Sequence, residues 1–133
     1  MALVTGMKRK QYEIVTEDKT ASALGSNAFP VYATSALVLL MENTCRKCVE
    51  KHLEEGQTIV GTKVNVNHVS PSLQGTTMYC ECELVSIDGA RLTFKVGCYD
   101  EMKKAGEGTL ECMVVNREDF LRKIAEKTRN SCI

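Results

Sequence analysis

The sequence lacks an excess of charge of either sign, because its 17 Lys and Arg residues are matched by 17 Asp and Glu residues. It also lacks a basic block and any patch in which basic and aromatic side chains alternate, the patterns typical of nucleic-acid-binding chains. These absences argue against nucleic acid as a partner.

Long apolar runs are missing as well. The longest run, Ala36 to Met41, is far too short to span a bilayer. At the N-terminus the apolar residues 1–4 precede the basic residues 8–10, which reverses the order found in a signal peptide. We therefore expect neither a membrane segment nor a secretory leader.

Seven cysteines make an odd number and are scattered through predicted helices and strands. This pattern predicts reduced thiols used as small apolar residues in a cytoplasmic protein. Cys45 and Cys48 form a C-x-x-C pair, and Cys80 and Cys82 are imaginable partners in a zinc site. Redox C-x-x-C pairs stand at helix N-termini, whereas this one comes late in a helix, so we expect no metal and no redox role.

The length of 133 residues suits a single domain covering residues 1–133. The pattern predicts a strand at 10–16, a helix at about 34–54 before Gly56, strands at about 58–69, 75–87, 90–100 and 107–115, and a terminal helix after Asn116. Asp88-Gly89 predicts a two-residue hairpin turn, and the first half of the long helix is apolar all round, as in an enclosed helix. The fold class is therefore α+β, with an antiparallel sheet of about five strands wrapped around a long central helix, the hotdog architecture. Such a sheet leaves an edge strand, which favours a homodimer.

Glu42 stands in the apolar half of the predicted helix. Its neighbours three or four positions away are Val38, Leu39, Cys45 and Arg46. A glutamate on such a face is seldom buried without a partner. Two interpretations stay open: a structural pair with Arg46, or a functional carboxylate.

His68 shares strand parity with Val64 and Val66, so we expect it to face the core. A lone histidine there is more often structural than catalytic, but a carboxylate that orients the imidazole would favour function. His52 lies on the charged half of the helix and is predicted to be a surface residue.

Thr34 opens the predicted helix, where its hydroxyl would ordinarily cap the first turn. The same helix N-terminus offers free amides that suit a developing oxyanion. Eight helical residues rise about 12 Å, so Thr34 and Glu42 cannot touch within one regular helix. Either Thr34 lies in a folded-back loop or one site draws on two chains, and we favour two chains.

The segments Tyr32–Thr34, Leu40–Glu42, Gly61-Thr62 and Asn67-His68 resemble the fluoroacetyl-CoA thioesterase group of hotdog enzymes. The resemblance runs from about Phe29 to the terminal helix. It implies a dimer with sites at its interface and hydrolysis of an acyl-CoA, with coenzyme A part of the substrate and no separate cofactor. It casts Thr34 as nucleophile or hydroxyl donor, His68 as base with Glu42 beside it, and Gly61 as lining the acyl end.

Two positions depart from the family pattern. The loop between Phe29-Pro30 and Thr34, which covers the acyl group in the family, is one residue shorter, and Ser35 replaces a usual glycine. We predict that Phe29 and Ser35 contact the substrate, a short or small acyl-CoA, while the acyl group itself stays open.

Two other functions compete with an acyl-CoA thioesterase. One is a hotdog module that binds an acyl-CoA without turnover. The other is hydration of an enoyl thioester, which is disfavoured because neither Asp88 nor Asp100 has a histidine beside it.

Overall fold

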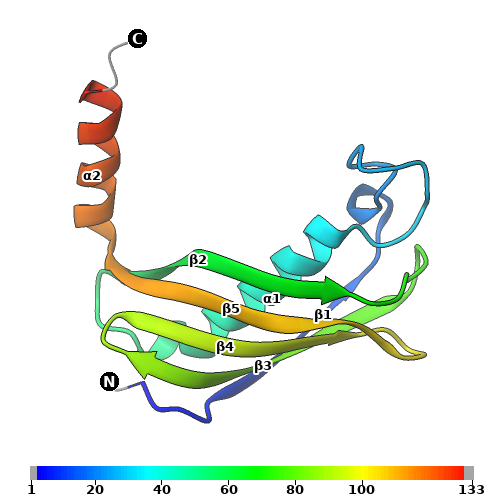
Figure 1. Cartoon of the computed structure of the whole chain (residues 1–133), viewed down its shortest axis with the longest axis horizontal. Helices are drawn as coiled ribbons and strands as arrows, with labels where there is room; N and C mark the ends of the chain where they lie inside the picture. The colour runs from blue at the N-terminus through cyan, green and yellow to red at the C-terminus, as the bar shows by residue number, and fades with distance from the viewer. Residues whose placement is uncertain (1–2, 131–133) are drawn as a thin grey trace.

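The chain folds into one curved antiparallel sheet with a long helix across its inner face (Figure 1). The computed structural model describes residues 3–130. Its strands are β1 (Lys8–Ile14), β2 (Gln57–His68), β3 (Thr77–Asp88), β4 (Arg91–Tyr99) and β5 (Lys104–Asn116), and its helices are α1 (Thr34–Val49), α2 (Arg117–Asn130) and the short 3-10 turns η1 (Glu17–Lys19) and η2 (Glu50–His52). The strand order β1-β3-β4-β5-β2 leaves β1 and β2 as edges. The predicted α+β hotdog fold is confirmed.

Two predicted boundaries need correction. Asp88 pairs with Arg91, so the hairpin turn is Gly89-Ala90, with Gly89 at the positive φ of 60° that such turns favour. The regular α-helix ends at Val49 and tightens into η2, several residues before Gly56.

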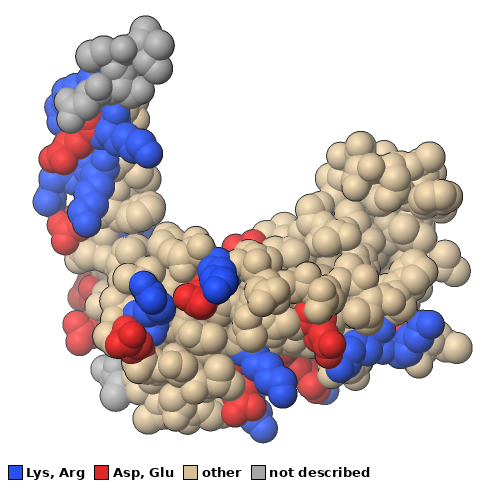
Figure 2. Space-filling view, in the orientation of Figure 1, with Lys and Arg blue, Asp and Glu red and all other residues tan. Residues whose placement is uncertain are grey.

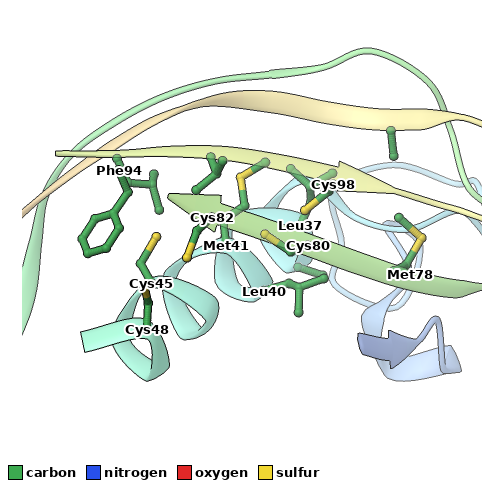
Figure 3. Close-up of a cluster of buried hydrophobic side chains, with 14 of the residues drawn as sticks. Leu37, Leu40, Met41, Cys45, Cys48, Met78, Cys80, Cys82, Phe94 and Cys98 are labelled. Atoms are coloured by element: carbon green, nitrogen blue, oxygen red, sulfur yellow. The ribbon is translucent and has the colours of Figure 1, made fainter. Parts of the chain in front are cut away.

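One face of α1 packs on the inner face of the sheet and forms the core (Figure 3). The buried positions recur every three or four residues, as a helix stripe must. They are Leu37, Leu40, Met41, Cys45 and Cys48 on α1, facing Met78, Cys80, Cys82, Phe94 and Cys98 on the sheet. The six described cysteines are buried and free, in line with their predicted use as small core residues, whereas Cys132 lies outside the described residues.

The opposite face of α1 is open. Ser35, Leu39 and Glu42 follow at helical spacing, and Leu39 is 56% exposed. The prediction that this half of the helix is enclosed on all sides is therefore wrong for a single chain. The reason is topological: the sheet stops at the edge strand β2 and does not reach around this face.

A bulge in β2 sets which side chains face α1. Gly61 pairs with Cys112 and Lys63 pairs with Glu111, so Thr62 is an extra residue in the ladder. Strict alternation would put Gly61 and His68, seven residues apart, on opposite faces. The bulge restores both to the inner face, together with Val64.

On the first strand, β1, the apolar side chains face outward. Tyr12 and Ile14 point outward and are exposed, while Glu13 points inward. On the outer face the rings of Tyr12, Tyr79 and Tyr99 form a ladder, with centroids 5.7 and 5.0 Å apart. Cross-strand aromatic contact therefore accounts for the outward position of Tyr12.

Candidate functional site

The structure joins Thr34 to His68. Ala33 is the N-cap of α1 and Thr34 its first helical residue, so the hydroxyl does not cap the helix. Instead Thr34 Oγ1 lies 2.8 Å from His68 Nδ1, at hydrogen-bond distance. A hydroxyl against an imidazole nitrogen is the arrangement in which the ring can accept the hydroxyl proton.

His68 is held in its neutral form. Burial lowers the pKa of its imidazole below the ordinary 6.5, and the Ser70 backbone offsets part of this effect. Nε2 is buried and has no hydrogen-bond partner among the described residues. With the proton on Nε2, Nδ1 keeps its lone pair for the Thr34 hydroxyl, as a general base requires.

A cavity of about 280 Å³ adjoins this pair. Thr34 and His68 form part of its wall, and the remaining lining comes from the loop before α1 and the segment after β2, namely Ala21, Ser26, Asn27, Val31, Tyr32, Val69, Ser70 and Pro71. The hydroxyl and the imidazole thus face a small pocket that is open to solvent in the single chain. A larger hollow of about 980 Å³ lies on the outer face of the sheet and contains none of the predicted site residues.

A hydrogen-bond network that the sequence did not reveal holds in place the residues just before Thr34. The Tyr32 hydroxyl is buried and donates to the carboxylate of Glu13, which also accepts from Lys19 Nζ at 2.9 Å. The Ala33 N–H donates to the Lys19 carbonyl at 3.0 Å. Burial, followed by the Glu13 hydrogen bond, raises the pKa of Tyr32, so its phenol keeps its proton. These contacts tie the start of α1 to β1 and η1.

The Glu42 carboxylate lies against the backbone of Gly61 and not against a basic side chain. A Cβ at Gly61 would lie 2.9 Å from Glu42 Oε2, so the glycine leaves the space that the carboxylate occupies. Arg46 turns away to Glu50 (3.1 Å) and Asn43, which shows that the structural Glu42–Arg46 interpretation is wrong. Among the described residues Glu42 forms no hydrogen bond or ion pair. Within residues 3–130 it is therefore a carboxylate without a polar partner.

The negative charge of Glu42 affects the pKa of Cys112 on the neighbouring strand β5. Burial and the Glu42 carboxylate together raise the pKa of the Cys112 thiol to about 11. Cys112 is the β5 residue that pairs with Gly61. The Glu42 carboxylate, although it belongs to α1, therefore lies beside an interior residue of β2.

Within one chain the two pairs are far apart. Gly61 and His68 are seven residues apart on β2, roughly 20 Å in an extended strand. Thr34 and Glu42 are separated by about 12 Å along α1. The structure thus brings together Thr34 with His68 and Glu42 with Gly61, but not the two pairs with each other.

The remaining predicted positions are solvent-facing. Ser35 is exposed on the open face of α1, and Phe29 is exposed on the loop before it. Neither is part of the cavity wall, so their contact with substrate stays a prediction. His52 lies in η2, half-buried and remote from the cavity.

Five of the six described thiols have a raised pKa and are poor ligands and nucleophiles, whereas a hydrogen bond with Cys98 lowers the pKa of Cys80. The Cys82 thiol and burial raise the pKa of Cys48, which keeps it protonated. Within residues 3–130, no cluster of three or more His, Cys, Asp or Glu side chains could hold a metal ion. In the same part of the chain, no helix is long and apolar enough to cross a membrane.

Known proteins share this fold and much of this sequence. Residues 15–118 match the fluoroacetyl-CoA-specific thioesterase family. The chain belongs to that family. The fluoroacetyl-CoA thioesterase of Streptantibioticus cattleyicolor is 37% identical over 101 residues, which cover 75% of this chain and 73% of that protein.

Solved structures agree with this family assignment. A structure of a fluoroacetyl-CoA thioesterase superposes with a TM-score of 0.90 at 31% identity, covering 96% of this chain and 98% of the other. A thioesterase superfamily member from Thermus thermophilus gives a TM-score of 0.85 at 26% identity, covering 96% and 97%. The resemblance drawn from the sequence is confirmed.

Proposed function

We propose that this member of the fluoroacetyl-CoA-specific thioesterase family hydrolyses the thioester bond of a small acyl-CoA. The hydrogen bond between Thr34 Oγ1 and His68 Nδ1 carries the proposal, because it joins a hydroxyl to a neutral base beside a cavity. The pocket of about 280 Å³ beside this pair leaves room for a small acyl group. Named relatives that act on fluoroacetyl-CoA support the coenzyme A thioester.

The chemistry follows from the two side chains. His68 takes the proton of Thr34 as the hydroxyl attacks the thioester carbonyl, or of a water molecule that attacks in its place. The free amides at the start of α1 would stabilise the negative charge that develops on the carbonyl oxygen. If Thr34 attacks, coenzyme A leaves as the thiol with the proton from His68, and a water molecule activated by His68 then hydrolyses the Thr34 ester, which releases the carboxylic acid and restores the hydroxyl. If water attacks directly, the same proton transfer releases the coenzyme A thiol and the carboxylic acid in one step.

Glu42 enters this site from a second copy of the chain. A carboxylate beside the imidazole stabilises the imidazolium that forms during the reaction. Within one chain Glu42 is too far from His68 to contact it. Among the described residues Glu42 also has no hydrogen-bonding or ionic partner. A homodimer with two sites at its interface resolves both facts.

The register of the edge strand supports such a dimer. Two β2 strands can pair in antiparallel fashion about Asn65, with Thr62 an extra residue in each strand. In this register Val66 lies opposite the second copy's Val64. The same register sets His68 opposite the second copy's Gly61, against which that copy's Glu42 lies. Residues opposite each other in an antiparallel pair share a face, and both members of each pair here point inward. The half-exposed Val64 would then be covered.

We also propose a cytoplasmic location. Six buried cysteines without a disulfide suit a reducing compartment. No cofactor is proposed, because hydrolysis needs only water and the side chains described above.

The test is release of free thiol from a panel of short, branched and aromatic acyl-CoAs. Thr34→Ala should abolish hydrolysis if the hydroxyl is acylated, and Thr34→Ser should keep part of it. Thr109→Ala, an exposed threonine on the outer face of the sheet, is the matched control and should be unaffected. A wild-type protein that binds acyl-CoAs without turnover would instead identify a non-catalytic acyl-CoA-binding hotdog module.

The shared site has its own test. Thr34→Ala and Glu42→Gln homodimers should each be impaired, but mixed subunits form one intact site in every heterodimer. Random mixing should then restore about a quarter of the parent activity, because half the dimers are mixed and each has one intact site of two. Sedimentation of the wild type as a monomer at micromolar concentration, with activity intact, would rule out the shared site.

A further inference from the structure

We propose that α2 of one protomer packs against the loops around the catalytic cavity of its partner and forms an outer wall of the partner's acyl site. The inference rests on the proposed dimer but adds a role for α2, whose apolar side chains take no part in the site described above. The occupant of this helix face is a second copy of the chain.

The first observation is that α2 gets little support from its own chain. It stands off the end of the sheet as a nearly isolated rod (Figure 1). Phe120, Leu121 and Ile124 form one stripe on it, and the last two are 58% and 48% exposed. A 14-residue helix is marginal in water without tertiary contacts, so this stripe needs a partner surface.

The second observation is where α2 points. Asn116 pairs with Gln57 at the start of β2, and α2 begins at the next residue. In Figure 1 the helix rises past β2, on the side where a second sheet would continue. Antiparallel pairing sets the start of one β2 beside the end of the other. The base of α2 therefore lies beside the segment that follows His68 in the second copy.

The third observation is that this segment and the neighbouring loop expose matching apolar side chains. Val69 and Leu73 are more than half exposed, as are Leu24 and Phe29 on the loop before α1. Leu73 forms a bridge with Val31, and both Val31 and Val69 line the catalytic cavity. A helix seated on these side chains covers the cavity from outside.

The space for this contact is visible in one chain. Figure 2 shows a broad hollow between α2 and the loop at the other end of the molecule, with few charged side chains on its floor. A second copy placed in this hollow, turned by half a revolution, presents its own loop to α2 and its own α2 to the loop. Each acyl site then has a wall from each protomer.

The experiment replaces the stripe and asks in which protomer the effect appears. Leu121→Gln/Ile124→Gln puts two glutamines on the apolar stripe, and Glu118→Gln/Glu126→Gln puts two glutamines elsewhere on α2 as the control. The first variant should lower kcat/KM for the preferred acyl-CoA at least about tenfold, the low end of what a lost apolar contact costs in a substrate pocket. The control should match the parent.

Subunit mixing then decides between the two protomers. In a heterodimer of the stripe variant with Thr34→Ala, the intact Thr34 belongs to the stripe variant and the intact α2 to its partner. That single site should work with the parent kcat/KM. If the heterodimer site is as weak as the stripe variant alone, α2 acts on its own chain and the inference is overturned.

Other outcomes separate this inference from the proposed function. A monomeric, active wild type overturns both. Activity of Thr34→Ala at the parent rate overturns the catalytic assignment alone, and His68→Ala then serves as the inactive partner in the same mixing. If circular dichroism shows that the double variant is unfolded, the milder Ile124→Ala is carried through the same experiment, and parent kcat/KM in its homodimer overturns the inference.

Discussion

The two faces of α1 differ in almost every physical property although they belong to one helix. The face toward the sheet carries Leu37, Met41 and Cys45, all fully buried. The face toward the edge strand carries Ser35, Leu39 and Glu42, which are exposed or partly exposed. The packed face stabilises the fold, and the open face carries the polar groups that the proposed chemistry needs.

This contrast teaches that the proposed reacting groups lie on the side of α1 that the single chain leaves uncovered. Thr34 and Glu42 both contact the edge strand β2, through His68 and Gly61 respectively. A carboxylate on the packed face would be desolvated at a high cost, whereas the one hydroxyl on that face, Thr44, is satisfied by the Leu40 carbonyl at 2.7 Å. Changes on the open face should therefore reduce activity more than stability, and changes on the packed face should do the reverse.

The largest expected effect on activity is that of His68→Ala. Loss of the base should lower turnover by on the order of 10²–10⁴, the usual contribution of general-base catalysis. Measured acyl-CoA hydrolysis should be compared with that of His52→Ala, the chain's other histidine, which should match the parent. Hydrolysis by His68→Ala at the parent rate would show that His68 is not the base and would favour a non-catalytic acyl-CoA-binding module.

The pH dependence should show the same base. Protonation of His68 removes the lone pair that accepts the hydroxyl proton, so kcat/KM should fall about tenfold per pH unit on the acid side. Burial lowers the pKa of this imidazole, and the Glu42 carboxylate of a second copy beside it would raise that pKa, so Glu42→Gln should move the midpoint of the fall to lower pH. A midpoint that is the same in the parent and in Glu42→Gln would contradict the place of Glu42 beside the imidazole.

A smaller effect is expected from Gly61→Ala. The added Cβ would meet Glu42 Oε2 at 2.9 Å, so the carboxylate must shift, and we expect an activity loss of about tenfold. Gly61 has no positive φ, so stability should change by less than about 1 kcal/mol. Gly97→Ala, which crowds the end of Tyr99 on the outer face, is the matched control for activity. Equal losses in both variants would mean that Glu42 has no special role.

The smallest effect on activity belongs to the packed face. Cys45→Ala and Cys48→Ala should lower the free energy of unfolding by about 1 kcal/mol through lost packing. Hydrolysis per folded molecule should stay at the parent level, and no zinc should be found by elemental analysis. Activity lost in a variant that still folds would show that the two faces are not separate in function.

The fold was readable from the sequence to a large extent because its signals are local. The helical spacing of Leu37, Leu40 and Met41 and the turn after Asp88 each depend on a few neighbouring residues. The errors arise where tertiary context overrides pattern. The first half of α1 is apolar all round, yet Leu39 is exposed in the single chain because the sheet ends at β2, a fact that no local rule contains.

Apart from the family resemblance, the sequence predicted the site only as separate residues and not as an arrangement. Simple parity would assign Gly61 and His68 to opposite faces, and only the bulge at Thr62 brings them to the same one. The hydrogen bond between Thr34 and His68 joins residues 34 positions apart and needs the folded chain. The pairing of Glu13 with Tyr32 gave no signal at all, because neither residue forms a motif.

The tyrosine ladder on the outer face has a practical consequence for optical measurements. The chain has four tyrosines and no tryptophan, so its intrinsic emission comes from tyrosine alone. Three of the four, Tyr12, Tyr79 and Tyr99, are stacked on the side of the sheet away from the cavity. Only Tyr32 lines it. A single tryptophan introduced at Phe29 could therefore be excited at wavelengths where tyrosine absorbs little, and its emission would report on the loop before α1 during substrate entry.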